Sequence, residues 1–104
     1  MTEMKTKIEI VTDIKFYIAQ QDGRYPDWYV GVSKDAKGKM FNGHKVDEKK
    51  DLWIYRQAVT SDVAREVEDH FMNMLGTDGS TGPSHDTADM VYVFKKNEHT
   101  EPKG

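Results

Sequence analysis

Residues 28–44 are the part of the chain most suited to chemistry, because a predicted strand, a glycine and two titratable side chains follow one another there. Residues 28–33 are aromatic and β-branched, which favours a strand. Gly31 has no Cβ, so a ligand can approach the backbone closely at this point. After a Ser-Lys-Asp turn, Lys39 and His44 follow in a segment of helical character. A strand, a tight turn and a positively charged helix form a suitable arrangement for binding a phosphate.

The same segment resembles the second half of the motif of the GIY-YIG endonucleases. The resemblance is carried by Tyr29-Val30-Gly31-Val32-Ser33 and by Asp35, Lys39, Met40 and His44. In that family a Tyr-Ile-Gly strand end precedes a Ser or Thr, a short helix with a catalytic Arg, and often a His. A later helix supplies a Glu that binds a divalent metal. Here Ala64-Arg65-Glu66-Val67-Glu68 resembles that helix, so the resemblance covers residues 28–76 and puts Glu68 at the metal position.

The resemblance implies a metal-dependent domain that cleaves phosphodiesters or binds the DNA backbone. Such cleavage needs a metal to neutralise charge, an activated nucleophile and a cation near the phosphate. Glu68 would bind Mg²⁺ or Mn²⁺, Tyr29 would orient or activate water, and Lys39 would be the cation. His44 would assist with protons, since imidazole titrates near neutral pH. Tyr29, Lys39 and Glu68 are therefore expected to face one shared depression.

Two departures from the family pattern weigh against full activity. Lys39 stands where the family has Arg, and an ammonium cannot hold phosphate oxygens in the planar fork of a guanidinium. The family's first tyrosine, from a Gly-Ile-Tyr strand, would fall at Tyr17, but the Gly is missing. Tyr92, on the last predicted strand, is an alternative source of that tyrosine. A non-catalytic interaction module on the same scaffold, or an unrelated small α/β protein, therefore stays open.

Each of these residues also has an ordinary structural explanation. Glu68 can pair with Arg65 on the surface of one helix, because the two are three residues apart. Tyr29 can fill one side of a half-buried sheet, and Lys39 and His44 can be solvated. The hypothesis of a site depends on the ordered set of four residues and not on any one of them.

The N-terminal segment has an apolar spacing that predicts a helix over residues 4–20. Its apolar side chains recur at spacings of four, three, three and four, at Met4, Ile8, Val11, Ile14 and Ile18. An alternation with a period of two also fits a strand, but the length without a turn residue favours the helix. We expect it to pack on the sheet through Val11, Ile14 and Ile18. The nuclease family would instead need a strand here, with a hairpin turn at Asp22-Gly23.

The rest of the chain predicts an α/β fold with a small three-stranded sheet flanked by helices, of the GIY-YIG-nuclease-like type. The predicted strands are residues 28–33, 52–58 and 91–95, and the further helices are residues 36–44 and 61–75. Ser33 or Asp35 is suited to cap the first of these helices, and Ser61 the second. Gly76 is suited to end the second helix, whose apolar face is formed by Ala64, Val67, Phe71, Met74 and Leu75.

Composition bounds the domain count and the partners. The chain has 104 residues, 37% of them hydrophobic and 32% charged, which suits one domain. No apolar run is long enough to cross a membrane, and no cysteine is present, so a cytoplasmic protein is expected. The net charge is −3, but the segment from Lys34 to Lys50 has six lysines against Asp35, Asp47 and Glu48. The sequence therefore predicts a local basic patch able to meet a DNA backbone.

Order is expected over residues 4–96, and a disordered tail over residues 97–104. Residues 76–89 are rich in Gly, Ser, Thr, Asp and Pro, which is typical of a mobile loop. His85, Asp86 and Asp89 in this loop are at most a weak metal site, because ordering a flexible segment costs entropy.

Overall fold

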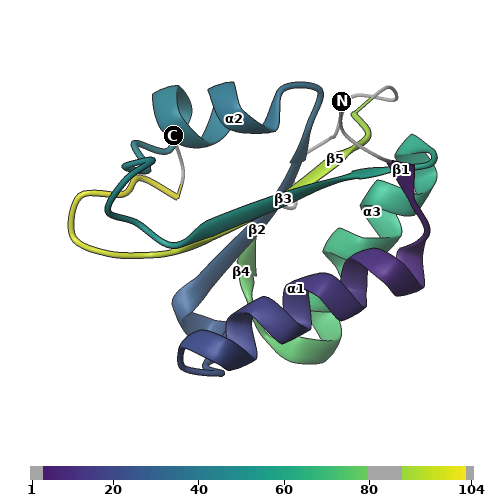
Figure 1. Ribbon diagram of the computed structural model, residues 1–104, viewed down its shortest axis with the longest axis horizontal. Helices are drawn as coiled ribbons and strands as arrows, with labels where there is room; N and C mark the ends of the chain where they lie inside the picture. The colour runs from purple at the N-terminus through teal and green to yellow at the C-terminus, as the bar shows by residue number, and fades with distance from the viewer. Residues whose placement is uncertain (1–3, 80–87, 103–104) are drawn as a thin grey trace.

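The fold is built on a five-stranded mixed sheet with helices on both faces (Figure 1). The computed structural model describes residues 4–79 and 88–102. The strands are β1 (Met4–Lys5), β2 (Trp28–Ser33), β3 (Trp53–Ala58), β4 (Asp78–Gly79) and β5 (Met90–Lys95). β5 lies at the centre and pairs antiparallel with β2 and β3. The two-residue β1 and β4 add one parallel strand at each edge.

The prediction of a three-stranded sheet is therefore wrong, although its three long strands are confirmed within one residue at each end. The two additional strands have only two residues each, which is too short for an alternating pattern to be visible in the sequence. The hairpin that the nuclease family would need before β2 is absent from the described residues, because a helix occupies that segment.

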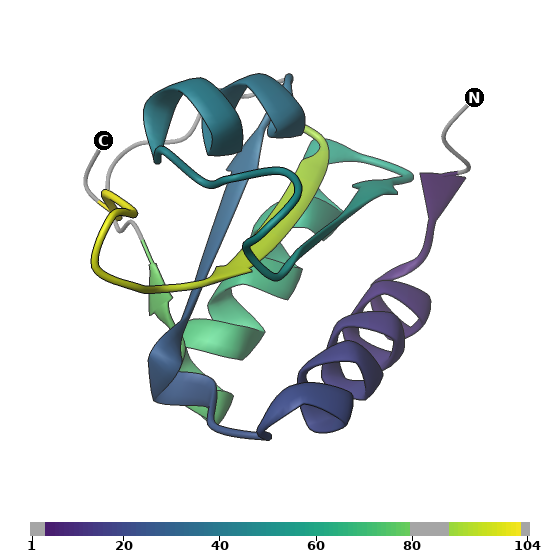
Figure 2. The ribbon, with the colours of Figure 1, turned by 60° about the vertical axis from the view of Figure 1, so that its left-hand side comes forward.

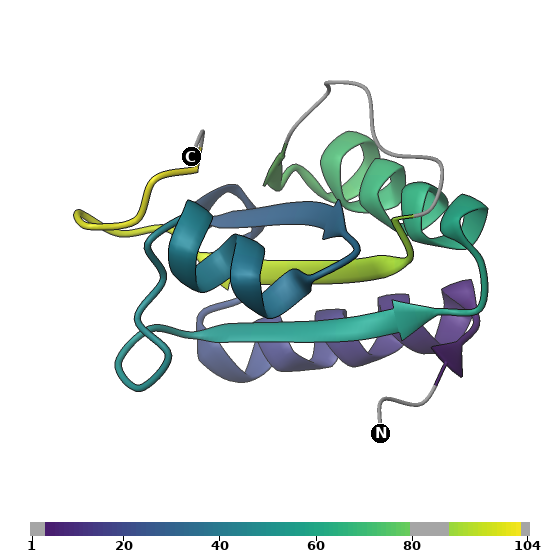
Figure 3. The ribbon, with the colours of Figure 1, turned by 90° about the horizontal axis from the view of Figure 1, so that it is seen from above.

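Three helices cover the sheet, two on one face and one on the other (Figures 1 and 3). They are α1 (Lys7–Gln21), α2 (Ala36–Gly38) and α3 (Ser61–Asp69). α2 and α3 each continue into a wider helical turn, at Lys39–Gly43 and His70–Leu75. α1 and α3 pack on one face of the sheet, and the segment from α2 packs on the other, so each face has its own apolar cluster. None of the helices in the described ranges is long and apolar enough to cross a membrane.

The N-terminal helix predicted over residues 4–20 is confirmed from Lys7 onward, whereas Met4 and Lys5 form β1, and the buried side of the helix differs in part. Thr6 caps α1 by accepting from the N–H of Glu9, whose side chain in turn accepts from the N–H of Thr6. Its buried residues are Ile10, Ile14 and Ile18, spaced by four, and Ile8 is 78% exposed. The sequence contains two overlapping apolar stripes, and only the sheet selects between them.

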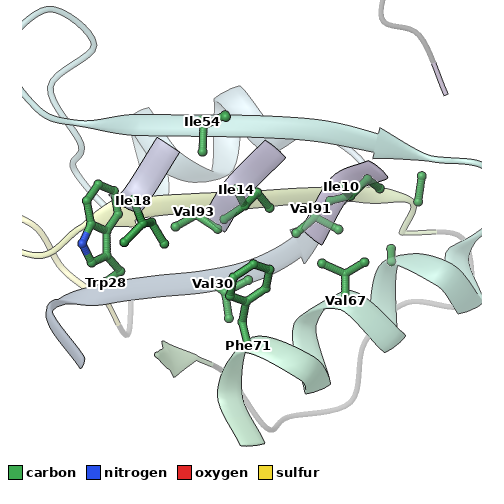
Figure 4. Packing of buried hydrophobic residues seen from close by; sticks show 12 residues of the cluster. Ile10, Ile14, Ile18, Trp28, Val30, Ile54, Val67, Phe71, Val91 and Val93 are labelled. Carbon is green, nitrogen blue, oxygen red and sulfur yellow. The ribbon is translucent and has the colours of Figure 1, made fainter. Parts of the chain in front are cut away.

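The larger core cluster lies between the sheet, α1 and α3 (Figure 4). The three buried isoleucines of α1 meet Val30 of β2 and the valines of β5, Val91 and Val93. α3 contributes its predicted apolar face, with Ala64, Val67 and Phe71 fully buried. Met74 is 74% exposed, which corrects its place on that face.

The predicted caps are confirmed for the most part. The Asp35 side chain accepts from the N–H of Gly38 at 3.0 Å and begins α2. Thr60, and not Ser61, caps α3 by accepting from the N–H of Val63. Gly76 ends the helical segment with a φ of 87°, a left-handed conformation that favours glycine.

The C-terminal segment differs from the predicted disorder. Residues 97–102 turn back from the end of β5 toward the helical segment of α2 (Figures 1 and 2). Thr100 is 7% exposed, and the N–H of Glu101 donates to the His44 carbonyl at 2.7 Å. Residues 80–87, which hold most of the predicted mobile loop with His85 and Asp86, lie outside the described residues.

Candidate functional site

A cluster of four rings lies between the sheet and α2, and it contains two of the predicted site residues. Tyr29 comes from β2, Tyr92 and Phe94 from β5, and His44 from the end of the helical segment that begins with α2. The Tyr29 and His44 ring centroids are 4.8 Å apart, and His44 lies 5.5 Å from Tyr92 and 5.1 Å from Phe94. Sequence analysis joins Tyr29 to His44 and offers Tyr92 as an alternative tyrosine, and the structure adds Phe94. We call these four residues the ring cluster.

Strand register is the reason that Tyr92 reaches this position. In the antiparallel pair of β2 and β5, Tyr29 lies opposite Phe94 and Gly31 lies opposite Tyr92. Side chains of one strand alternate between the two faces, so these four residues share the α2 face. A Cβ at Gly31 would collide with the ring and hydroxyl of Tyr92. The space beside Gly31, expected to admit a ligand, is therefore filled by Tyr92.

His44 is held in one tautomer by its two hydrogen bonds. Its Nδ1 lies 2.8 Å from the carbonyl oxygen of Glu101, which can only accept, so Nδ1 donates. In neutral His44 the other nitrogen, Nε2, then accepts from the Tyr92 hydroxyl at 2.8 Å. Burial lowers the pKa of His44 from its ordinary value of 6.5, and the charge of Lys39 lowers it further, against the opposing effect of the Glu101 carbonyl. At neutral pH, His44 is therefore uncharged and orients the hydroxyl of Tyr92.

Tyr92 acts as a hydrogen-bond donor in this cluster. Burial raises its pKa well above the ordinary value of 10.0, and nearby Tyr29 and Glu68 raise it further. The phenol therefore stays protonated at neutral pH. The first tyrosine of the family motif cannot be taken from Tyr17, because that residue lies on α1 and packs edge-on against Trp28 in the core of the other face.

Glu68 is a buried carboxylate on α3, only 9% exposed. Burial, and secondarily the charge of Asp69, raise its pKa from 4.5 to about 7. No hydrogen bond or ion pair joins Glu68 to another residue in the described ranges. The surface pair expected as its ordinary explanation is not formed, since Arg65 pairs with Asp62. A buried carboxylate without a partner among the described residues is a candidate for binding a cation or for transferring a proton.

The four predicted site residues do not meet in one cluster. Tyr29 and His44 are in the ring cluster, and Lys39 is exposed at its margin, close enough for its charge to affect His44. Glu68 extends from α3, which packs on the opposite face of the sheet. Tyr29, Lys39 and Glu68 were expected to face one shared depression, but α2 and α3 lie on opposite faces of the sheet, so this expectation is not met. The link from Glu68 to the ring cluster is its charge, which acts on Tyr92.

The described residues hold no group of three or more His, Cys, Asp or Glu side chains that could bind a metal. A complete protein cage is therefore absent from residues 4–79 and 88–102. A single buried carboxylate such as Glu68 still fits Mg²⁺, which keeps several water ligands and is commonly bound through one or two carboxylates.

Comparison with known proteins gives no family for this chain. No family model matches it, and neither a curated protein nor a solved structure does so. The geometry of the described side chains is therefore the basis for a functional proposal.

Proposed function

We propose that this protein is a GIY-YIG-nuclease-like domain that binds the DNA backbone and cleaves it slowly with Mg²⁺ or Mn²⁺. The observation that carries the proposal is the antiparallel pairing of β2 with β5, which brings Tyr92 beside Tyr29 and His44. The ring centroids of the two tyrosines are 6.4 Å apart. In this proposal β5, the last long strand of the chain, takes the place of the Gly-Ile-Tyr strand that the N-terminal segment lacks.

The roles of the residues follow from their protonation and contacts. Tyr29 and Tyr92 would orient the attacking water, with the Tyr92 hydroxyl directed by His44. Lys39, exposed beside His44, would face a phosphate as a point charge. Glu68 acts on the ring cluster through its charge near Tyr92 and not through a shared depression, and it would hold the metal, which when bound supplies charge neutralisation. We place this activity in the cytoplasm, as the absence of cysteine suggests.

Two features support slow cleavage in preference to fast cleavage. Tyr29, His44 and Tyr92 are only 5%, 1% and 2% exposed, so a substrate reaches their polar atoms only after neighbouring side chains move. Lys39 would meet a phosphate without the bidentate contact that an Arg forms. Removal of one principal electrostatic contact typically costs about two to three orders of magnitude in rate.

A nicking assay on supercoiled DNA tests this proposal. We expect slow nicking that needs Mg²⁺ or Mn²⁺, is lost in Glu68→Gln and is faster in Lys39→Arg. Glu66→Gln is the matched control, because Glu66 lies on the same helix and is exposed. Nicking that is unchanged by Glu68→Gln would disprove the assignment of the metal ligand. Absence of nicking in every variant, together with unchanged amide chemical shifts around Glu68 on adding Mg²⁺, would disprove the nuclease-like proposal.

A non-catalytic interaction module on the same scaffold is the second candidate function. The observation that favours it is the burial of the ring cluster, which in that case is part of the core. This candidate predicts that Mg²⁺ perturbs no amide near Glu68 and that Lys39→Arg creates no nicking activity.

A further inference from the structure

A row of three partly exposed aromatic side chains lies on the α2 face of the sheet, outside the ring cluster. It consists of Phe41, which follows α2, and of Trp53 and Tyr55 on β3. The Phe41 and Trp53 rings meet edge to face at 5.0 Å, and the Trp53 and Tyr55 rings are nearly parallel, 6.2 Å apart with 12° between their planes. We call these three residues the aromatic row.

The aromatic row is accessible because α2 does not lie over β3. Figure 3 shows the α2 ribbon over β2 and β5, with β3 along the lower edge of the sheet in this view. β5 pairs with one edge of β3, and β1 pairs with the other edge only at Gln57 and Ala58, so no described strand covers that outer edge at Trp53 and Tyr55. The Trp53 indole N–H is satisfied within the chain, since it donates to the Glu48 carbonyl at 3.0 Å. A ligand would therefore contact the aromatic row through the faces of its rings and not through the indole N–H of Trp53.

The segment that contains Phe41 also carries lysines without an ion pair among the described residues. The lysines of the segment from residue 34 to residue 50 are Lys34, Lys37, Lys39, Lys45, Lys49 and Lys50, and none forms an ion pair with a described residue. Two acids of the segment are engaged with backbone: Asp35 accepts from Gly38, and Asp47 accepts from Lys49 and Lys50. The Lys37 ammonium lies 5.8 Å from the centroid of the Tyr55 ring. Positive charge is thus placed directly at the aromatic row.

Aromatic faces beside free cations are the combination that binds single-stranded nucleic acid, because bases stack on the rings while phosphates meet the cations. A duplex keeps its base faces inside its own stack and can use only the cations. We infer that the aromatic row and the six lysines form a binding surface for a single-stranded polynucleotide. This inference rests on the proposed function for the class of ligand, nucleic acid, and it does not require that the protein cleave that ligand.

The test is a titration of labelled oligonucleotides of about twelve nucleotides, without metal and with a chelator present. Oligo-dT and oligo-U are compared with a duplex of the same length by fluorescence anisotropy. We expect either single strand to bind more tightly than the duplex, and the comparison of oligo-dT with oligo-U shows whether DNA or RNA binds more tightly. Trp53 emission should be quenched on binding, whereas Trp28 is fully buried and should not respond.

Two variants separate stacking from charge. Trp53→Leu keeps an apolar side chain beside Phe41 and should weaken single-strand binding by roughly ten- to hundredfold, with little change for the duplex. Lys37→Gln should reduce the slope of log affinity against log salt by roughly 0.7. Lys15→Gln is the matched control, because Lys15 is exposed on α1 at the other face of the sheet. Tyr55→Leu replaces Trp53→Leu if circular dichroism shows that the latter is unfolded.

Equal affinity for single strand and duplex, or single-strand binding unchanged in a folded Trp53→Leu or Tyr55→Leu variant, would overturn the inference. Failure of cleavage would not, because binding is measured without metal. Glu66→Gln, at an exposed position of α3, should bind single strands as the unmodified protein does. Single-strand binding without nicking would support this binding surface and count against the nuclease-like proposal. Nicking without a preference for single strands would support the nuclease-like proposal and overturn the inference of this surface.

Discussion

Glu68 is a carboxylic acid in a buried position, where the charged form is disfavoured and the pKa is raised. Its carboxyl group is protonated below about pH 7 in the folded protein but only below pH 4.5 in the unfolded chain. Between these values the folded state binds the additional proton, so the contribution of Glu68 to the free energy of unfolding falls as pH rises. Near neutral pH the residue is poised between its two protonation states, which suits a proton-transfer group or a metal ligand.

Replacing Glu68 by Gln should therefore stabilise the protein at high pH. The amide is neutral at every pH, whereas the buried carboxylate of the wild type is charged at high pH. The difference in free energy of unfolding between the variant and the wild type should therefore be roughly 2 kcal/mol more favourable to the variant at about pH 8 than at about pH 4. Urea denaturation at the two pH values measures this gain. Glu66→Gln, at an exposed position of α3, should show no such difference. An equal effect of Glu68→Gln at both pH values would contradict the raised pKa of the buried Glu68 carboxyl.

The Tyr92 hydroxyl is the second residue-level feature with a measurable consequence. Tyr92→Phe keeps the ring but leaves the buried Nε2 of His44 without its partner. An unsatisfied buried polar atom costs about 1–3 kcal/mol, so the free energy of unfolding should fall by that amount. Tyr25→Phe is the control, because Tyr25 packs against Phe71 and should change stability by less than about 0.5 kcal/mol. Equal stability of Tyr92→Phe and wild type would show that water replaces the hydroxyl.

Among the elements, the C-terminal residues 97–102, here called the clip, are hydrogen-bonded to the end of the helical segment that begins with α2. Its Glu101 forms two hydrogen bonds with His44, one through each backbone polar group. Asn97 and His99 also bond to Asp51, in the connector between the helical segment and β3. The polar arrangement of the ring cluster therefore depends on a segment that the composition alone predicts to be disordered.

Truncation after Lys96 should release this clip. The Nδ1 atom of His44 loses its carbonyl partner, and we expect a fall in the free energy of unfolding of about 1–3 kcal/mol. The His44 pKa should fall further below 6.5, because the Glu101 carbonyl raises it. Histidine chemical shifts against pH measure the second effect. Truncation after Pro102 is the matched control, because it leaves all contacts of residues 97–102 in place. Unchanged His44 titration after the longer truncation would contradict the role of the clip.

Across the whole molecule, charge is segregated despite a net value of only −3. The lysines of residues 34–50 lie on the α2 side, and α3 with its acids lies across the sheet. Long-range attraction of a polyanion should therefore act on one face only.

Binding to duplex DNA should accordingly be weak, independent of sequence and steeply reduced by salt. Neutralising a phosphate releases counterions, and each contact adds roughly 0.9 to the slope of log affinity against log salt for a duplex. Joint replacement of Lys34, Lys37 and Lys39 by Gln should lower that slope by roughly 3. Anisotropy titrations over a range of salt concentrations measure it. A slope that is unaffected by the triple change would place the DNA on another surface.

Local features of the sequence determined most of the elements. Alternation and β-branched residues indicate the three long strands, and spacing with capping residues indicates the helix begun by Asp35 and the helix ended by Gly76, although Thr60 and not the predicted Ser61 caps the latter. These signals suffice because they depend on residues a few positions apart. The basic character of residues 34–50 is likewise a property of composition.

Only the tertiary structure decided which residues meet. Two apolar stripes overlap on α1, and contact with the sheet buries Ile10 in preference to Ile8. The central place of β5 puts Tyr92 beside Tyr29, although the two are distant in sequence. The Glu101 carbonyl, which sets the tautomer of His44, carries no signal in its side-chain type. Strand order and backbone contacts of this kind arise from long-range packing, which periodicity and composition do not specify.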